Sequence, residues 1–131
     1  MLVNRHTFTL AASTGDIAAA TSEVINGPVL SVHVQYGSAT DTGFATTAVL
    51  TIATNKTAQT VLAETLSTLA TTTVNLHRMP RQVGHTSAGV ALTATESLRR
   101  EPVYVGNDKL VITATSVGTG TRTATLVILT G

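Results

Sequence analysis

The chain has 131 residues, a formal net charge of +1 and no cysteine. This length fits one domain with a sizeable core, and the lack of cysteine excludes disulfides, cysteine-based zinc sites and thiol nucleophiles. Because no basic run is longer than Arg99-Arg100, the charge pattern does not indicate a nucleic-acid-binding protein.

No segment is apolar over the length of a membrane-spanning helix, and the N-terminal segment lacks the apolar stretch of a signal peptide. We therefore expect synthesis in the cytoplasm and no membrane partner. Hydrophobic residues make up 43% of the chain, but aromatic residues only 3% and charged residues only 11%. Threonine, roughly a fifth of the chain, and valine both favour strands. Such a low charge density is typical either of a surface covered by partners or of a threonine-rich soluble surface.

The first half of the chain contains several segments with strand patterning. Residues 5–11 alternate between apolar residues and threonine, which predicts a first strand that could form a sheet edge. Residues 17–24 favour a short strand, Asn26-Gly27-Pro28 a turn, and residues 29–36 a further strand. A loop of small polar residues over 37–44 then precedes a strand over 46–54.

The middle of the chain is less clearly patterned. Asn55-Lys56-Thr57 predicts a turn, and residues 61–66 favour a strand, although their spacing also fits a short helix. A segment that begins at Val74 ends at Pro80. After it we expect a loop over 81–89, a short strand over 90–95 and a loop over 97–100.

The clearest patterning lies in residues 101–131. It predicts a short strand, a tight turn at Gly106-Asn107-Asp108, a long strand, a glycine-rich turn over 117–120 and a closing strand. Two long alternating runs joined by such a turn predict a β-hairpin. We expect this hairpin to be the wall onto which the rest of the chain packs.

The fold class follows from these elements. About eight short strands, with turn signals every eight to twelve residues or so, are typical of a sandwich or barrel. We predict that residues 1–131 form one all-β domain, an antiparallel β-sandwich of jelly-roll type.

The residues that could carry chemistry do not form a recognisable site. The four histidines, His6, His33, His77 and His85, include no pair with the helical or hairpin spacing that brings metal ligands together. The carboxylates are scattered and no nucleophile elbow is present. The few aromatic residues and the lack of tryptophan disfavour a sugar-stacking platform. We predict no catalytic residue, no metal, no cofactor and no enzyme activity.

Arginine is the most informative residue type. Arg78, Arg81, Arg99 and Arg100 fall in two neighbouring predicted loops, and are either a solvated rim or a docking face, because guanidinium groups suit interfaces. Arg5 lies in an N-terminal arm, residues 1–7, that is a second contact candidate because terminal strands often add to a neighbour's sheet edge. We predict a partner-contact role for these five arginines.

The second half of the chain resembles a known group of proteins. The run HRMPRQVGHTSAGVALT, followed by EPVYVGNDKLVITATSVGTGTRTATLVIL, is similar to the C-terminal half of small structural proteins of tailed phages. Earlier, INGPVLSV resembles the turn into the second or third strand of that family, whereas residues 37–73 carry none of its motifs. The positions that match in the second half are Arg78, Pro80, Arg81, His85, Ala88, Gly89, Pro102, Val105 and Asn107.

This resemblance implies a virion component, most plausibly a capsid decoration (cement) protein on the outer surface of the phage head. Such a protein needs no active site, and it binds the major capsid protein and itself, often as a homotrimer, so that many weak contacts add up. A head–tail connector, tail or baseplate component would share the composition. A carbohydrate- or receptor-binding module ranks third, because its aromatic platforms and loop ligands are scarce here.

Overall fold

A computed structural model of the chain describes residues 2–13, 17–37, 43–45, 47–66, 74–83 and 100–131. No helix occurs in this part of the chain, as its threonine- and valine-rich composition predicts. Its strands are β1 (Asn4–Ala12), β2 (Ala18–Gly37), β3 (Val49–Thr54), β4 (Thr60–Thr65), β5 (Val74–Arg78), β6 (Arg81–Val83), β7 (Arg100–Thr115) and β8 (Arg122–Thr130).

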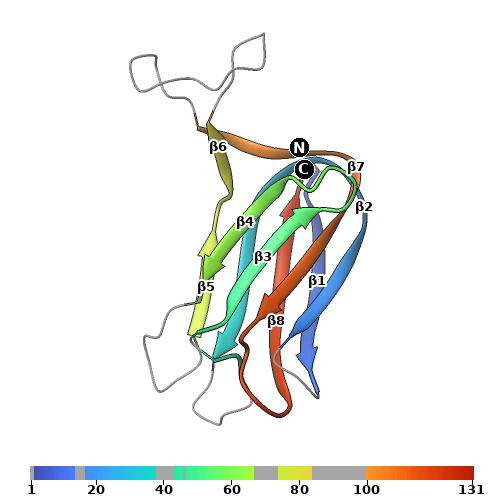
Figure 1. The fold of residues 1–131 in the computed structure, drawn as a ribbon. Coiled ribbons are helices and arrows are strands. Elements are labelled where there is room, and N and C mark those ends of the chain that lie inside the picture. Colours follow the sequence, from blue (N-terminus) through green and yellow to red (C-terminus); the bar gives the residue numbers. More distant parts are fainter. Residues whose placement is uncertain (1, 14–16, 38–42, 46, 67–73, 84–99) are drawn as a thin grey trace.

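The strands form one hydrogen-bonded sheet in the order β1-β8-β2-β7-β3-β4, with β5 beside β2 and β6 beside β7 (Figure 1). All of these strand pairs are antiparallel. The all-β, antiparallel class predicted from the sequence is therefore confirmed. The finer jelly-roll arrangement stays a prediction.

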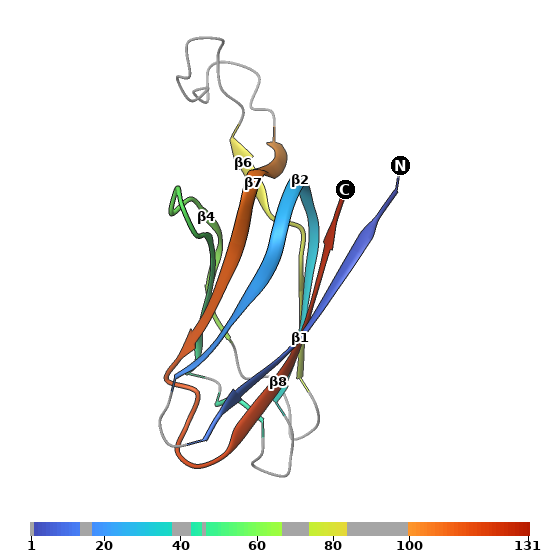
Figure 2. The ribbon, with the colours of Figure 1, turned by 90° about the vertical axis from the view of Figure 1, so that its right-hand side faces the viewer.

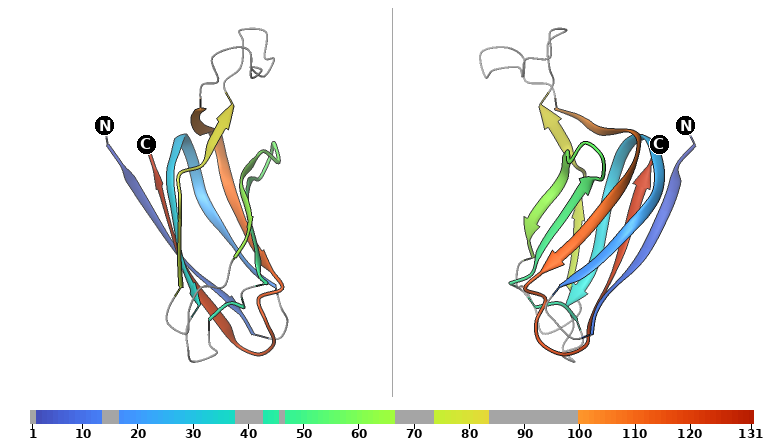
Figure 3. Two further views of the ribbon diagram at one scale, coloured as in Figure 1. Left: turned by 90° about the vertical axis from the view of Figure 1, so that its left-hand side faces the viewer. Right: turned by 45° about the vertical axis from the view of Figure 1, so that its right-hand side comes forward.

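The sheet is folded over so that two parts of it face each other (Figures 2 and 3). The first half of β2 pairs with β7, whereas its second half pairs with β8 and β5. We call β1, β8, the second half of β2 and β5 the β8 layer. The first half of β2, together with β7, β3 and β4, makes the β7 layer. The long strand β2 thus belongs to both layers.

The bend in β2 and β7 occurs where the sequence predicted two turns. Gly27 has a φ of 147° and Asn107 a φ of 52°. Between the pairs Ile25↔Asp108 and Gly27↔Val105, one residue of β2 faces two of β7, which is a β-bulge. Neither segment is a separate turn outside the strands, because the two signals lie opposite each other within β2 and β7 and pairing continues on both sides of them. The first half of β2 rises to this point in one layer and its second half descends from it in the other, so the chain reverses direction here while its pairing with β7 continues (Figure 2).

The predicted C-terminal hairpin was also wrong. β7 pairs with β2, β3 and β6, whereas β8 pairs with β1 and β2, so the two strands lie in different layers. The link between them contains Ser116, Gly118 and Gly120, all with positive φ. It is a turn as predicted, but it crosses from one layer to the other. The β3–β4 pair, joined through Asn55-Lys56-Thr57, forms a hairpin instead.

Several boundaries differ from the sequence predictions. The strand expected over 46–54 begins at Val49. The segment 61–66, for which a strand was favoured over a helix, is the strand β4. Arg81 to Val83 form β6 and not a loop, because they pair with the start of β7. The remainder of that predicted loop, the strand over 90–95 and residues 97–99 lie outside the described residues, and Arg100, placed in the last loop, begins β7.

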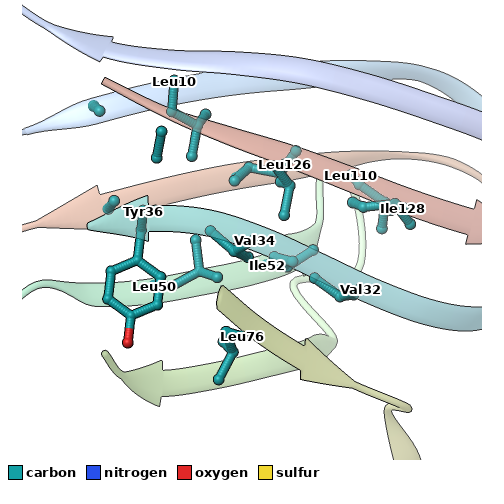
Figure 4. Close-up of a cluster of buried hydrophobic side chains, with 14 of the residues drawn as sticks. Leu10, Val32, Val34, Tyr36, Leu50, Ile52, Leu76, Leu110, Leu126 and Ile128 are labelled. Carbon is teal, nitrogen blue, oxygen red and sulfur yellow. The ribbon is translucent and has the colours of Figure 1, made fainter. Parts of the chain in front are cut away.

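The core lies between the two layers and explains the alternation of each strand. Inward side chains from the β8 layer meet those of the β7 layer, and all of them are almost fully shielded from water (Figure 4). Burial of each such side chain contributes about 1.5–3 kcal/mol, which offsets the entropy of ordering the chain. The labelled members of this cluster are Leu10, Val32, Val34, Tyr36, Leu50, Ile52, Leu76, Leu110, Leu126 and Ile128.

Candidate functional site

The face of the β8 layer that points away from the core carries an open hollow of about 350 Å³. Because side chains alternate along a strand, Val127 and Leu129 point outward between the buried residues of β8 and form its half-buried floor. Its polar lining comes from three neighbouring strands: Arg5 of β1, Ser31 and His33 of β2, and His77 of β5. No acidic side chain is among these lining residues.

His33 and His77 are brought together by the pairing of β2 with β5. They are direct partners in the register, and their rings meet edge to face with centroids 6.0 Å apart. Both side chains are exposed. The sequence analysis missed this pair, because two strands so far apart in the chain give no spacing signal. Only the alternation of each strand, which puts both histidines on outward positions, hinted at it.

Of the predicted contact residues that the structure describes, Arg5 alone lines this hollow. It lies on β1 opposite Leu129 of β8, and it makes no hydrogen bond or ion pair with the residues that the structure describes. Its charge is therefore available to a partner. The predicted arm that contains it is shorter than expected, since Asn4 to Thr7 belong to β1 and pair with β8.

Arg78 has a role within the fold. Its Nε donates to both carboxylate oxygens of Glu64, at 3.1 and 2.8 Å, and its Nη2 donates to Oε1 at 2.5 Å. These hydrogen bonds raise the pKa of Arg78, against the opposing effect of its partial burial. The pair links β5 at the edge of the β8 layer to β4 at the edge of the β7 layer.

Two more of the predicted contact arginines, Arg81 and Arg100, lie on β6 and β7. Arg81 is exposed and pairs through its backbone with Pro102, while Arg100 pairs with Val83. The two arginines therefore lie on one two-stranded ribbon formed by β6 and the start of β7 (Figure 1). Arg99 lies outside the described residues. The structure thus places Arg81 and Arg100 together, and Arg5 on a separate face.

A second side-chain link closes the opposite edge of the molecule. His6 of β1 lies 3.2 Å from Glu23 of β2 through Nδ1, and its Nε2 lies 3.0 Å from the hydroxyl of Thr130. Glu23 belongs to the β7 layer and His6 to the β8 layer. This contact therefore links the two layers at one edge, as the Arg78–Glu64 pair links them at the other. We assign His6 a structural role.

Asp108 is the one buried carboxylate among the described residues, with 3% of its surface exposed. Burial alone would raise its pKa, but the backbone N–H groups of Lys56, Lys109 and Thr57, together with the Lys56 charge, lower it overall. These N–H groups lie 2.8, 2.8 and 3.4 Å from its oxygens. A carboxylate saturated in this way anchors the β3–β4 turn to β7 and is unsuited to accepting a proton.

Across the described ranges, no three metal-ligating side chains gather at one place. In the same ranges, no helix has the length and apolar character needed to cross a membrane. Comparison with known proteins found no matching family model, no similar curated protein and no similar solved structure.

Proposed function

We propose that this chain is a non-enzymatic structural protein of a phage virion, a capsid decoration protein that binds the outside of the head and stabilises it. Two independent features support this proposal. One is the resemblance carried by residues 78–107, and the other is the outer face of the β8 layer. The second feature carries the physical argument, because it offers a docking surface on a rigid all-β body.

The hollow on that face is suited to contact with another protein. It combines an apolar floor, Val127 and Leu129, with one cation, Arg5, that has no described partner. An arginine beside apolar surface is typical of protein interfaces, where the guanidinium can hold a carboxylate in two parallel hydrogen bonds. The complementary surface is an acidic side chain next to an apolar one, and we propose that the major capsid protein supplies it.

Self-association would use a different part of the molecule. Among the strands that the structure describes, β1 pairs with β8 alone and therefore ends the sheet. Leu2 is 81% exposed and Val3 48% exposed, immediately before this edge strand. An unpaired edge with exposed apolar residues favours addition of a strand from another chain, which gives a homotrimer a route to form. Arg81, Arg99 and Arg100 remain proposed as additional contacts with a neighbouring subunit or the capsid.

Charge reversal of Arg5 tests the docking face. Binding of purified protein to heads that lack it is measured by co-sedimentation, for the native chain, Arg5→Glu and the control Lys109→Glu. Lys109 is exposed on β7 in the other layer, so the control makes the same change in charge away from the hollow. Arg5→Glu is expected to weaken binding at least tenfold, while Lys109→Glu leaves it unchanged. Equal effects of the two variants, or none, would contradict the assignment of this face.

A further inference from the structure

We infer that His33 and His77 form a two-histidine site for a divalent transition-metal ion, with Cu²⁺ as its strongest ligand. The pairing of β2 with β5 places the two residues directly opposite each other on the outer face of the β8 layer. In an antiparallel pair, Cβ atoms of such partners lie about 4.5–5.5 Å apart, which lets both side chains reach one point above the sheet. This inference is independent of the proposed capsid role.

The distance between the rings fits one shared ion after a small rotation. A metal–nitrogen bond of about 2.0–2.1 Å puts two imidazole centroids roughly 4.5 Å apart at the 90° angle of adjacent ligands in a square-planar Cu²⁺ site, and roughly 5 Å apart at a tetrahedral angle. The observed separation is 6.0 Å. Both side chains are exposed, so rotation about their side-chain torsions meets little obstruction. The edge-to-face contact already holds the rings within about 1–1.5 Å of the separation that chelation requires.

The donor set selects the kind of metal. Two neutral imidazoles suit Cu²⁺, Ni²⁺ and Zn²⁺, and among these the affinity of nitrogen sites is highest for Cu²⁺. Mg²⁺ and Ca²⁺ require several oxygen ligands, and no carboxylate lines the hollow. Arg5 in the same hollow repels any cation, which further disfavours ions held by charge alone. Water would occupy the other coordination positions.

Metal binding would have a structural consequence. Among the described strands, β5 pairs with β2 alone. An ion held by His33 of β2 and His77 of β5 would therefore cross-link an edge strand to the sheet. Because the folded chain presents the two ligands together and the unfolded chain does not, added Cu²⁺ should stabilise the fold.

The test uses the full chain without an affinity tag of histidines. Cu²⁺ is titrated at pH 7.5 into the native chain, His33→Ala, His77→Ala and the double variant, with glycine as a weak competing chelator. If both histidines bind one ion, we expect one Cu²⁺ site per chain. Its affinity should fall at least tenfold in each single variant, and the double variant should lose about as much affinity as each single variant. Pulsed electron paramagnetic resonance should detect two imidazole nitrogens on the ion in the native chain and not in the variants.

Three results would overturn the inference. The first is a double variant that binds Cu²⁺ as tightly as the native chain, which would place the ion at the N-terminus or another histidine. The second is a single imidazole on the ion. The third is recovery of tight binding when the two single variants are mixed, because the ion would then bridge two chains. Both substituted positions are exposed, and His33→Gln with His77→Gln provides a second pair of variants if either alanine change disturbs folding.

Discussion

Arg78 and Glu64 join the two layers of the molecule at an edge where the described strands share no backbone pairing. The Arg78 guanidinium donates three hydrogen bonds to the Glu64 carboxylate, from β5 to β4. His6 and Glu23 occupy the equivalent position at the opposite edge. The folded-over sheet is thus held along its open sides by side chains, and its stability should depend on them.

Removal of the Arg78–Glu64 pair should destabilise the fold modestly. Arg78→Ala and Glu64→Gln are each expected to lower the free energy of unfolding by about 1 kcal/mol, because the pair is partly exposed but makes more than one hydrogen bond. Urea denaturation of both single variants and the double variant measures this. The effects should be less than additive, and Arg81→Ala, which is exposed, should have little effect. Additive effects of the two changes would show that the residues do not act as a pair.

The bend at Gly27 should tolerate no larger side chain. A Cβ atom at this position would lie 2.5 Å from the carbonyl oxygen of Gly131, and its φ of 147° is unfavourable for other residues. Gly27→Ala is expected to lower the free energy of unfolding by about 1–3 kcal/mol. Gly106→Ala is the matched control, because it lies in the same bulge with nothing within 4 Å of its Cβ. Similar unfolding midpoints for the two variants would contradict this account of the bend.

Asp108 should make stability depend on pH in the acid range. Its pKa in the folded chain is below the ordinary value of 3.8, so its contribution is fully present above about pH 4 and is lost as pH falls through the folded pKa. The urea concentration at the unfolding midpoint is measured from pH 7 down to pH 2. It should fall with pH in the native chain, and it should fall less in Asp108→Asn. Parallel pH profiles for the two proteins would contradict the anchoring role of this carboxylate.

Self-association should depend on the residues that precede β1. Leu2→Lys with Val3→Lys is expected to shift the protein from the proposed trimer towards monomer, because charges at a sheet edge oppose strand addition. Light scattering after size exclusion measures the mass. Met79→Lys is the control, since it also replaces an exposed apolar residue but lies between β5 and β6, away from β1. If the native chain is monomeric, or if both variants dissociate equally, β1 is not the association edge.

Local patterning predicted the class of the fold but not the pairing of its strands. The alternation around Leu10, Leu50 and Leu126 gave the right strands, because period-two patterning reports directly on which face is buried. The glycine-rich link after β7 was interpreted as a hairpin turn. The same kind of sequence also fits a connection that crosses from one layer to the other. Contacts with other strands decide whether the link forms a hairpin or a crossing, and the sequence of the link does not indicate these contacts.

The candidate site was predictable only in part. The sequence could propose Arg5 as a contact residue, which stays a prediction, but it could not indicate the surface on which Arg5 lies. The contact between His33 and His77, and the pair of Arg78 with Glu64, both depend on the placement of β5, which pairs with a strand distant in sequence. A single sequence contains no local signal for such pairing. The sequence therefore indicated which residue types were available, and the fold decided which of them meet.

The copy number of this protein in purified virions tests the proposed capsid role most directly. Under this proposal a phage encodes the chain, and quantitative mass spectrometry of its purified particles gives the ratio of the chain to the major capsid protein. A decoration protein is expected in constant proportion to the capsid protein, because symmetry repeats its binding site over the whole shell. A few copies per particle would instead indicate the neck or tail, and absence from the particle would contradict the virion role altogether.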